Sequence, residues 1–124
     1  MDEQNAPLFR QIAALIEDLI LEGRLAEGQR APSMNELAEF HRINPATARR
    51  GLVLLAGQGI LEKRRGVGMF VANSAGDLIR ERRHREIAAD YVAPLVDEAV
   101  KLDLSRADLH ELLEKVASSR GLYR

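Results

Sequence analysis

The chain has 124 residues, of which 46% are hydrophobic, 30% charged and only 4% aromatic. This length suits one ordinary domain, or a small domain with a short appendage, so we expect no separate large ligand-sensing domain. The scarcity of aromatic residues argues against a large all-β sandwich. The absence of cysteine excludes disulfides, thiolate zinc sites and a cysteine nucleophile.

The chain shows no sign of a membrane or secretory segment. No run approaches the roughly 18 consecutive apolar residues that a membrane span requires. The first residues are acidic and polar, whereas a secretory signal begins with a basic and then an apolar segment. We therefore expect a cytoplasmic protein with no membrane partner.

Charge is distributed by segment. Residues 1–29 hold two basic and six acidic side chains, residues 30–73 hold seven and three, and residues 74–124 hold nine and ten. A positive middle segment can attract a polyanion without making the whole molecule adhesive. Charge counts alone favour the simpler alternative of a solvated surface. The positions of the basic residues must decide between the two.

The first predicted element is an amphipathic helix. Apolar side chains recur at helical spacing from Phe9 to Ile20, which predicts a helix over about residues 7–22, ended by Gly23. Residues 24–32 are expected to form a loop with a short strand.

A second, short helix is predicted to follow. Ser33 and Glu36 have the spacing of a capping box, in which each side chain bonds the backbone amide of the other residue. The helix is expected to run to about Phe40 and to bury Leu37 and Ala38, with Phe40 as a further candidate core residue. A tight connection then leads to the next helix.

The third helix has its own start signal in Asn44 and Pro45, since Asn caps helices well and Pro suits the first helical position. We expect it to reach about Ala56 and to be ended by Gly57. Gly51 in its interior is best explained by close packing against another helix. The residues expected on its buried face are Ala48, Leu52 and Leu55.

A β-hairpin is predicted next. Residues 60–64 and 69–72 are short β-prone runs, and the turn-rich stretch 65–68 between them is basic. The small polar residues 73–76 are then expected to separate two parts of the chain. The predicted fold class is therefore mainly α, with a winged helix-turn-helix over residues 1–73 and a helical tail over residues 74–124.

The tail carries a wide apolar stripe, more than a lone helix can keep dissolved. Pro94 should kink this helix or divide it. Ser105 and Asp108 form an acidic variant of the capping box, which predicts a last helix over about residues 106–119 that buries Leu109, Leu112, Leu113 and Val116. We expect the stripe to pack against a second copy of the chain through Ile87, Tyr91, Leu95, Val96, Leu109, Leu112 and Leu113.

The order of helix, short helix, turn, helix and basic hairpin indicates a DNA-binding domain. A recognition helix presents short polar and arginine side chains from its first turns to the major groove. Arginine can fork onto guanine or grip a phosphate, and glycine lets the backbone of the hairpin tip approach a groove. The candidate DNA-binding residues are Ser33, Asn35, Asn44, Ala46, Thr47, Arg49, Arg50, Arg64, Arg65 and Gly66.

A second basic cluster follows the expected break. It could extend the contact with phosphates or bind an anionic effector, although a solvated helix surface is the simpler interpretation. Its members are Arg80, Arg82, Arg83, His84 and Arg85.

The sequence resembles the DNA-binding domain of the GntR family of bacterial transcription regulators. The resemblance covers residues 7–72 and is carried by the motifs at residues 23–28, 31–38, 44–52, 59–61 and 65–71. It implies a dimeric winged helix that binds a palindromic operator, usually as a repressor relieved by an effector.

The short two-helix tail further resembles the YtrA subfamily, as do Asn44 with Pro45 and the tail segment 99–113. In that subfamily the tail serves dimerisation and the genes often lie beside membrane transporter operons. The resemblance thus implies a homodimer with double-stranded operator DNA as its partner, and a link to a transporter operon. One departure is Asn35, where the family usually has arginine, so this contact is shorter and uncharged in this chain.

No catalytic or metal site is predicted. His41, His84 and His110 lack metal-ligand spacing, and no nucleophile and base stand in a convincing arrangement. We therefore expect no enzyme activity and no cofactor, and the sequence does not identify a small-molecule effector. The alternative from another class is a winged helix that docks an acidic protein partner through its basic hairpin.

Overall fold

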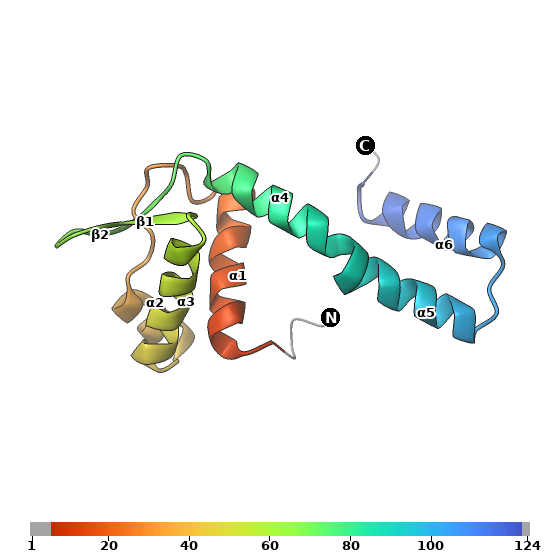
Figure 1. Cartoon of the computed structure of the whole chain (residues 1–124), viewed down its shortest axis with the longest axis horizontal. Coiled ribbons are helices and arrows are strands. Elements are labelled where there is room, and N and C mark those ends of the chain that lie inside the picture. The colour runs from red at the N-terminus through yellow and green to blue at the C-terminus, as the bar shows by residue number, and fades with distance from the viewer. Residues whose placement is uncertain (1–5, 123–124) are drawn as a thin grey trace. The chain divides into compact units, whose positions relative to one another are not determined.

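The computed structural model describes residues 6–122 and divides the chain into two compact units, one up to Arg85 and one from Glu86. None of the helices in this part of the chain is long and apolar enough to cross a membrane. The mainly helical fold predicted from the sequence is confirmed (Figure 1). In chain order, the elements are α1 (Leu8–Leu21), α2 (Met34–His41), α3 (Pro45–Gly57), β1 (Leu61–Arg64), β2 (Gly68–Val71), α4 (Ala75–Ile87), the π-helical segment η2 (Ala88–Val92), α5 (Ala93–Lys101) and α6 (Arg106–Ser119).

The first unit is built around a single apolar core. The largest side chains that are almost completely buried come from α1, α3, the hairpin and α4, namely Ile16, Leu55, Ile60, Val71 and Ile79. Ala48, Leu52, Leu37 and Ala38 are also buried, as the helical spacing predicted. Phe40 was wrongly placed among the core candidates. Its side chain is 82% exposed, because it lies on the outer face of α2.

Capping explains where α2 and α3 begin. The Ser33 hydroxyl accepts a hydrogen bond from the Glu36 amide (3.1 Å), and the Glu36 carboxylate accepts one from the Ser33 amide (2.9 Å). The Asn44 side chain accepts a hydrogen bond from the Ala46 amide (2.8 Å), and Pro45 occupies the first turn. These contacts satisfy backbone donors that a helix start leaves without partners, so both predicted start signals are confirmed.

Gly51 lets α1 and α3 approach each other closely. A Cβ atom at this position would lie 2.9 Å from the backbone oxygen of Phe9 and 3.2 Å from a methyl group of Ile12. The two helices run side by side at this point (Figure 1). Close packing is therefore the reason for a glycine inside the helix, as expected.

The hairpin forms as predicted, with β1 antiparallel to β2 and Leu61 opposite Val71. A third chain segment lies along β2, because Arg30 forms an isolated bridge with Phe70 and the Ala31 amide donates to the Met69 carbonyl (2.8 Å). The short strand expected between residues 24 and 32 is thus present only as this isolated bridge. It ties the start of α2 to the hairpin.

The polar residues 73–76 do not form an extended linker. α4 begins at Ala75, and the side chains of Ala75 and Ile79 are fully buried in the core of the first unit. The unit accordingly continues to Arg85, beyond the boundary at residue 73 that the composition suggested. The difference arises because the small polar residues precede a helix whose first turns pack against the winged helix.

The second unit contains η2, α5 and α6, and α6 runs back in the opposite direction to α5 (Figure 1). Pro94 lies in the first turn of α5, directly after the π-helical segment, so the regular α-helical pattern changes just before the proline while the backbone remains helical. Within the described part of this unit, Ala99 is the one buried apolar residue. Leu112, Leu113 and Val116 remain about half exposed, so the expected burial of this face is not supplied by the chain itself.

Candidate nucleic-acid interface

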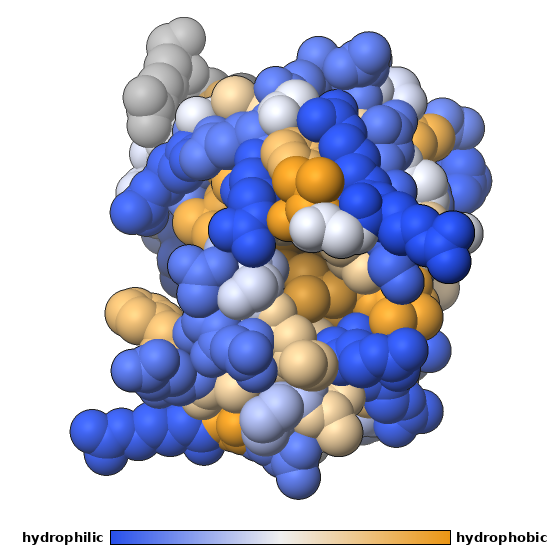
Figure 2. Space-filling view, turned by 90° about the vertical axis from the view of Figure 1, so that its left-hand side faces the viewer, coloured by the Kyte–Doolittle hydropathy of each residue, from blue (hydrophilic) through white to orange (hydrophobic). Residues whose placement is uncertain are grey.

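The start of α2, the recognition helix α3 and the hairpin together line one groove of about 340 Å³. Four of the predicted DNA-binding residues meet here, namely Ser33, Arg49, Arg64 and Gly66. Apolar side chains, including Met34, Leu52, Val53 and Val67, line the rest of the groove. Viewed from the hairpin side, hydrophilic side chains frame a strip of apolar surface (Figure 2). Ser33 and Gly66 lie more than 30 positions apart in the sequence, and the fold brings them to the same groove.

The charge of the groove has one sign. Its ionisable lining residues, among those that the structure describes, are Arg30, Arg49, Lys63 and Arg64, all of them basic. A concave surface with basic walls focuses a positive potential, which attracts the phosphates of a nucleic acid. The groove therefore has the electrostatics that a DNA-binding surface requires.

Arg30 was not among the predicted site residues. It reaches the groove because its backbone pairs with Phe70, and its guanidinium lies close to Gly68, where a Cβ atom would stand 2.8 Å from the Arg30 Nε atom. The sequence signal was the short strand expected in this loop, which would have placed Arg30 beside the hairpin.

Arg49 and Arg50 point to different neighbours. Arg49 lines the groove beside the hairpin, whereas the Arg50 guanidinium lies 4.0 Å from the centre of the Phe9 ring in α1, within cation–π distance. The two adjacent arginines therefore lie on different parts of the surface, Arg49 beside the hairpin and Arg50 beside the start of α1.

The hairpin tip is shaped for close approach to a partner. Gly66 has a φ of 76°, a conformation that glycine adopts without strain, and no atom would lie within 4 Å of a Cβ there. The Arg64 guanidinium lies 4.0 Å from the centre of the Phe70 ring, which holds it over β2. Arg65 is exposed at the tip. A thin basic tip of this kind fits phosphates or a narrow minor groove.

Four other predicted contact residues are not among those that line the groove. Asn35, Asn44 and Ala46 are exposed at the starts of α2 and α3, and Thr47 is half-buried. Ser33 and Asn44 each already serve as helix caps through their oxygen atoms. The hydrogen bond from the Ser33 amide, and next to it the contact with the Ser33 hydroxyl, lower the pKa of Glu36. The negative charge of Glu36 therefore stays on the capping box at neutral pH.

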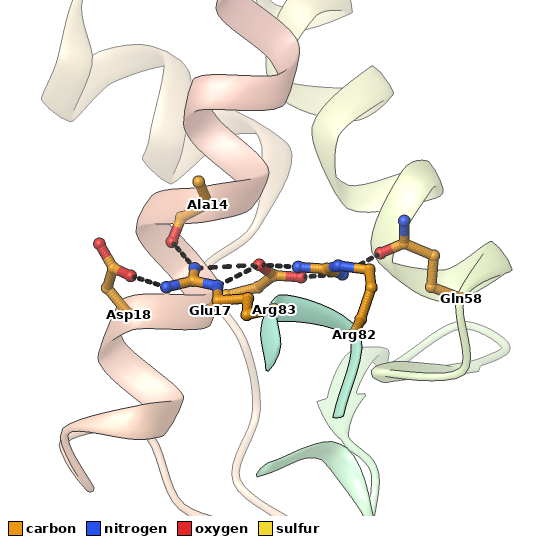
Figure 3. A network of polar contacts seen from close by, with 6 residues as sticks. All are labelled: Ala14, Glu17, Asp18, Gln58, Arg82 and Arg83. Atoms are coloured by element: carbon orange, nitrogen blue, oxygen red, sulfur yellow. Dashed lines mark hydrogen bonds and ion pairs between the residues drawn. The ribbon is translucent and has the colours of Figure 1, made fainter. Parts of the chain in front are cut away.

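Arg82 and Arg83 serve a different purpose from either interpretation of their basic cluster. The Arg82 guanidinium donates to both carboxylate oxygens of Glu17 (2.6 and 2.7 Å), and Arg83 donates to Glu17 (3.0 Å) and to Asp18 (2.8 Å). Figure 3 shows this network between α4 and α1. A phosphate site or a solvated surface was therefore the wrong expectation for these two arginines. The missed signal was the acidic Glu17 on the apolar face of α1.

The sequence has relatives among bacterial regulators. Residues 8–71 match the bacterial regulatory proteins of the gntR family. The HTH-type transcriptional repressor YtrA of Bacillus subtilis is 26% identical over 92% of this chain and 87% of its own length. The transcriptional regulator YisV of the same organism is 36% identical over 62% of this chain, which spans only 16% of that longer relative.

Solved structures show the same arrangement. A GntR-family transcriptional regulator from Bacteroides thetaiotaomicron superposes with a TM-score of 0.75 at 28% identity, covering 92% of this chain and 99% of the other. The DNA-binding domain of AraR, solved in complex with its operator, has a TM-score of 0.54 at 30% identity, over 58% of this chain and 87% of that domain. The relatives are transcriptional regulators rather than enzymes. The chain therefore belongs to the GntR family of bacterial regulatory proteins, within which it is YtrA-like, and it is a DNA-binding transcriptional regulator.

Proposed function

We propose that the protein is a homodimeric repressor that binds a palindromic operator through the groove between α2, α3 and the hairpin. The observation that carries this proposal is the convergence of Ser33, Arg49, Arg64 and Gly66 on one basic concave surface. In this arrangement the first turns of α3 enter the major groove of DNA, and the hairpin follows the adjacent backbone.

Each part of this surface has a distinct task. Arg49 is positioned to read a base edge or to grip a phosphate beside the hairpin, and Thr47 and Ala46 supply small contacts at the helix start. The amides at the start of α2, near Ser33 and Asn35, favour a phosphate through the helix dipole. Phosphate contacts fix the register, while base contacts determine the sequence that is recognised.

A second copy of the chain is the proposed cover for the apolar face of the second unit. Exposed apolar side chains at successive helical turns of this unit include Ile87, Tyr91, Leu95 and Val96, and α6 adds Leu112 and Leu113. Tyr91 is 59% exposed. Apolar surface repeated along helices in this way marks an interaction site. Pairing by two-fold symmetry would place two recognition helices about 34 Å apart, one turn of DNA.

The proposal that the protein represses rather than activates transcription rests on YtrA, a relative that aligns with 92% of this chain. YtrA is a transcriptional repressor. We extend the role of repressor to this chain and expect it to act in the cytoplasm. The YtrA-like tail further implies control of a transporter operon.

Selection of bound sequences from random duplexes tests this proposal. We expect the selected site to be an inverted repeat, to be protected on both half-sites and to carry two copies of the protein. An asymmetric site occupied by a single copy would contradict the homodimeric proposal. A reporter gene placed behind the site should lose expression when the protein is present, and increased expression would overturn the assignment as a repressor.

A further inference from the structure

Glu17 is an unusual member of the core. It is 3% exposed and is the one buried charged residue in the part of the chain that the structure describes. A buried carboxylate costs free energy unless charged partners and hydrogen bonds compensate for it. Glu17 has such partners in Arg82 and Arg83, so the chain keeps this charge at the place where α4 packs on α1.

The two arginines fix α4 to different elements. Arg82 holds Glu17 with two parallel hydrogen bonds and also donates to the side chain of Gln58 at the end of α3 (3.1 Å). Arg83 donates to Asp18 and, at 3.3 Å, to the Ala14 carbonyl on α1. Figure 3 shows the two guanidinium groups on either side of the Glu17 carboxylate. Attachment at two points, to α1 and to the recognition helix, restrains rotation of α4 about its own axis.

Ion pairing fixes the orientation of α4 on α1 more specifically than apolar packing would. A guanidinium pairs with a carboxylate in one plane and through two hydrogen bonds, so its geometry is specific. Burial acts to lower the pKa of Arg83, but the hydrogen bonds to Asp18 and Glu17, together with the negative charges of these two residues, outweigh it and raise that pKa. The Arg83 guanidinium therefore stays charged across the whole physiological pH range.

We propose that Arg82 and Arg83 are positioning residues that hold α4 in one orientation on the winged helix and thereby restrict the half-site separations that the dimer accepts. The inference rests on the proposed function, because only a dimer has two half-sites to separate. α4 is followed directly in the chain by η2 and α5, without an intervening loop. In the proposed dimer, the direction in which α4 leaves the winged helix would therefore affect the separation of the two recognition helices.

The test uses the full chain and duplexes that carry the selected inverted repeat with one to three base pairs inserted or removed between its halves. The variants are Arg82→Ala and Arg83→Ala, with Arg85→Ala as the matched control. Arg85 lies on the same helix but pairs with Glu81 of that helix (3.1 Å), so its removal changes the charge without touching α1. Binding to a duplex with a single half-site is measured alongside.

We expect the wild type and Arg85→Ala to prefer one separation by about tenfold over its neighbours. Arg82→Ala and Arg83→Ala should reduce that ratio to about twofold, while their affinity for the single half-site stays unchanged. Arg82→Lys and Gln58→Ala should give intermediate ratios, since each keeps part of the network, and they remain informative if an alanine variant does not fold.

The outcomes separate the two proposals. If the wild type prefers one separation and the folded variants keep the same ratio, the positioning role is wrong and the homodimer stands. If the wild type binds all separations equally, the positioning role is wrong and the homodimer stands. If the wild type sediments as a monomer, the homodimer proposal fails and the positioning role fails with it.

Discussion

The Arg50 guanidinium lies over the ring of Phe9, 4.0 Å from its centre, so a residue of the recognition helix is held against the start of α1. Arg10 approaches the same ring at 5.4 Å. The neighbouring Arg49 instead lines the groove beside the hairpin. Two adjacent arginines with the same chemistry therefore reach two different parts of the surface.

This relationship predicts that Arg50 contacts phosphate rather than bases. Arg50→Ala should weaken binding to all duplexes by a similar factor and reduce the slope of affinity against salt concentration by about 1. Titrations at several salt concentrations, with specific and unrelated duplexes, measure both quantities. A loss confined to the specific duplex would contradict the assignment.

Substitution of glycines inside and at the end of α3 tests the close packing of α1 and α3. Gly51→Ala should destabilise the fold by about 1–3 kcal/mol, because the new methyl group meets the Phe9 carbonyl and the helices must separate. Gly57→Ala is the control, since its methyl group would meet no atom within 4 Å. Urea unfolding followed by circular dichroism gives both values. Equal stability of the two variants would contradict the packing argument.

The buried ion pairs of Figure 3 predict a large loss of stability when the arginines are removed together. Arg82→Ala with Arg83→Ala leaves the Glu17 carboxylate buried without these two partners, which should cost about 3–5 kcal/mol. Removing the exposed Arg85 should cost no more than about 0.5 kcal/mol. Thermal unfolding of the two variants compares them, and similar losses would show that the network adds no stability.

The capping box predicts a dependence on acid pH. Because the folded chain lowers the pKa of Glu36, its contribution to the stability of α2 is present above the pKa of the unfolded chain. It is lost as the pH falls through the lower, folded value. Titration of the Glu36 carboxyl by NMR should give a midpoint below the usual value of 4.5, and Ser33→Ala should raise that midpoint. If the midpoint is the same in Ser33→Ala as in the wild type, the Ser33 hydroxyl does not contribute to the lowered pKa.

The local structure of the winged helix could be predicted from the sequence, because local rules set its boundaries. The capping signals at Ser33 and Asn44, and the spacing of Ala48, Leu52 and Leu55, depend only on residues within a turn or two. Long-range pairs could not be predicted. Arg82 and Glu17 lie 65 residues apart, and the periodicity of α4 says nothing about a carboxylate on α1.

Composition was misleading at two places for similar physical reasons. The small polar residues 73–76 suggested a break between two parts, yet a helix begins among them and buries Ala75 and Ile79 in the core. Phe40 was expected as a further core residue of the short helix, yet it lies on the outer face of α2. Burial depends on which face of an element meets its neighbours, and a short helix of eight residues defines that face weakly.

We expect the groove lined by Arg49 to read the sequence of the operator. The most direct measurement compares Arg49→Ala with the charge-matched control Arg120→Ala, using the selected operator and a set of its single-base variants. We expect Arg49→Ala to lose about 1–3 kcal/mol of discrimination at one base pair in each half-site, while Arg120→Ala keeps the wild-type profile. If Arg49→Ala binds the operator and its variants as the wild type does, the groove does not read the sequence.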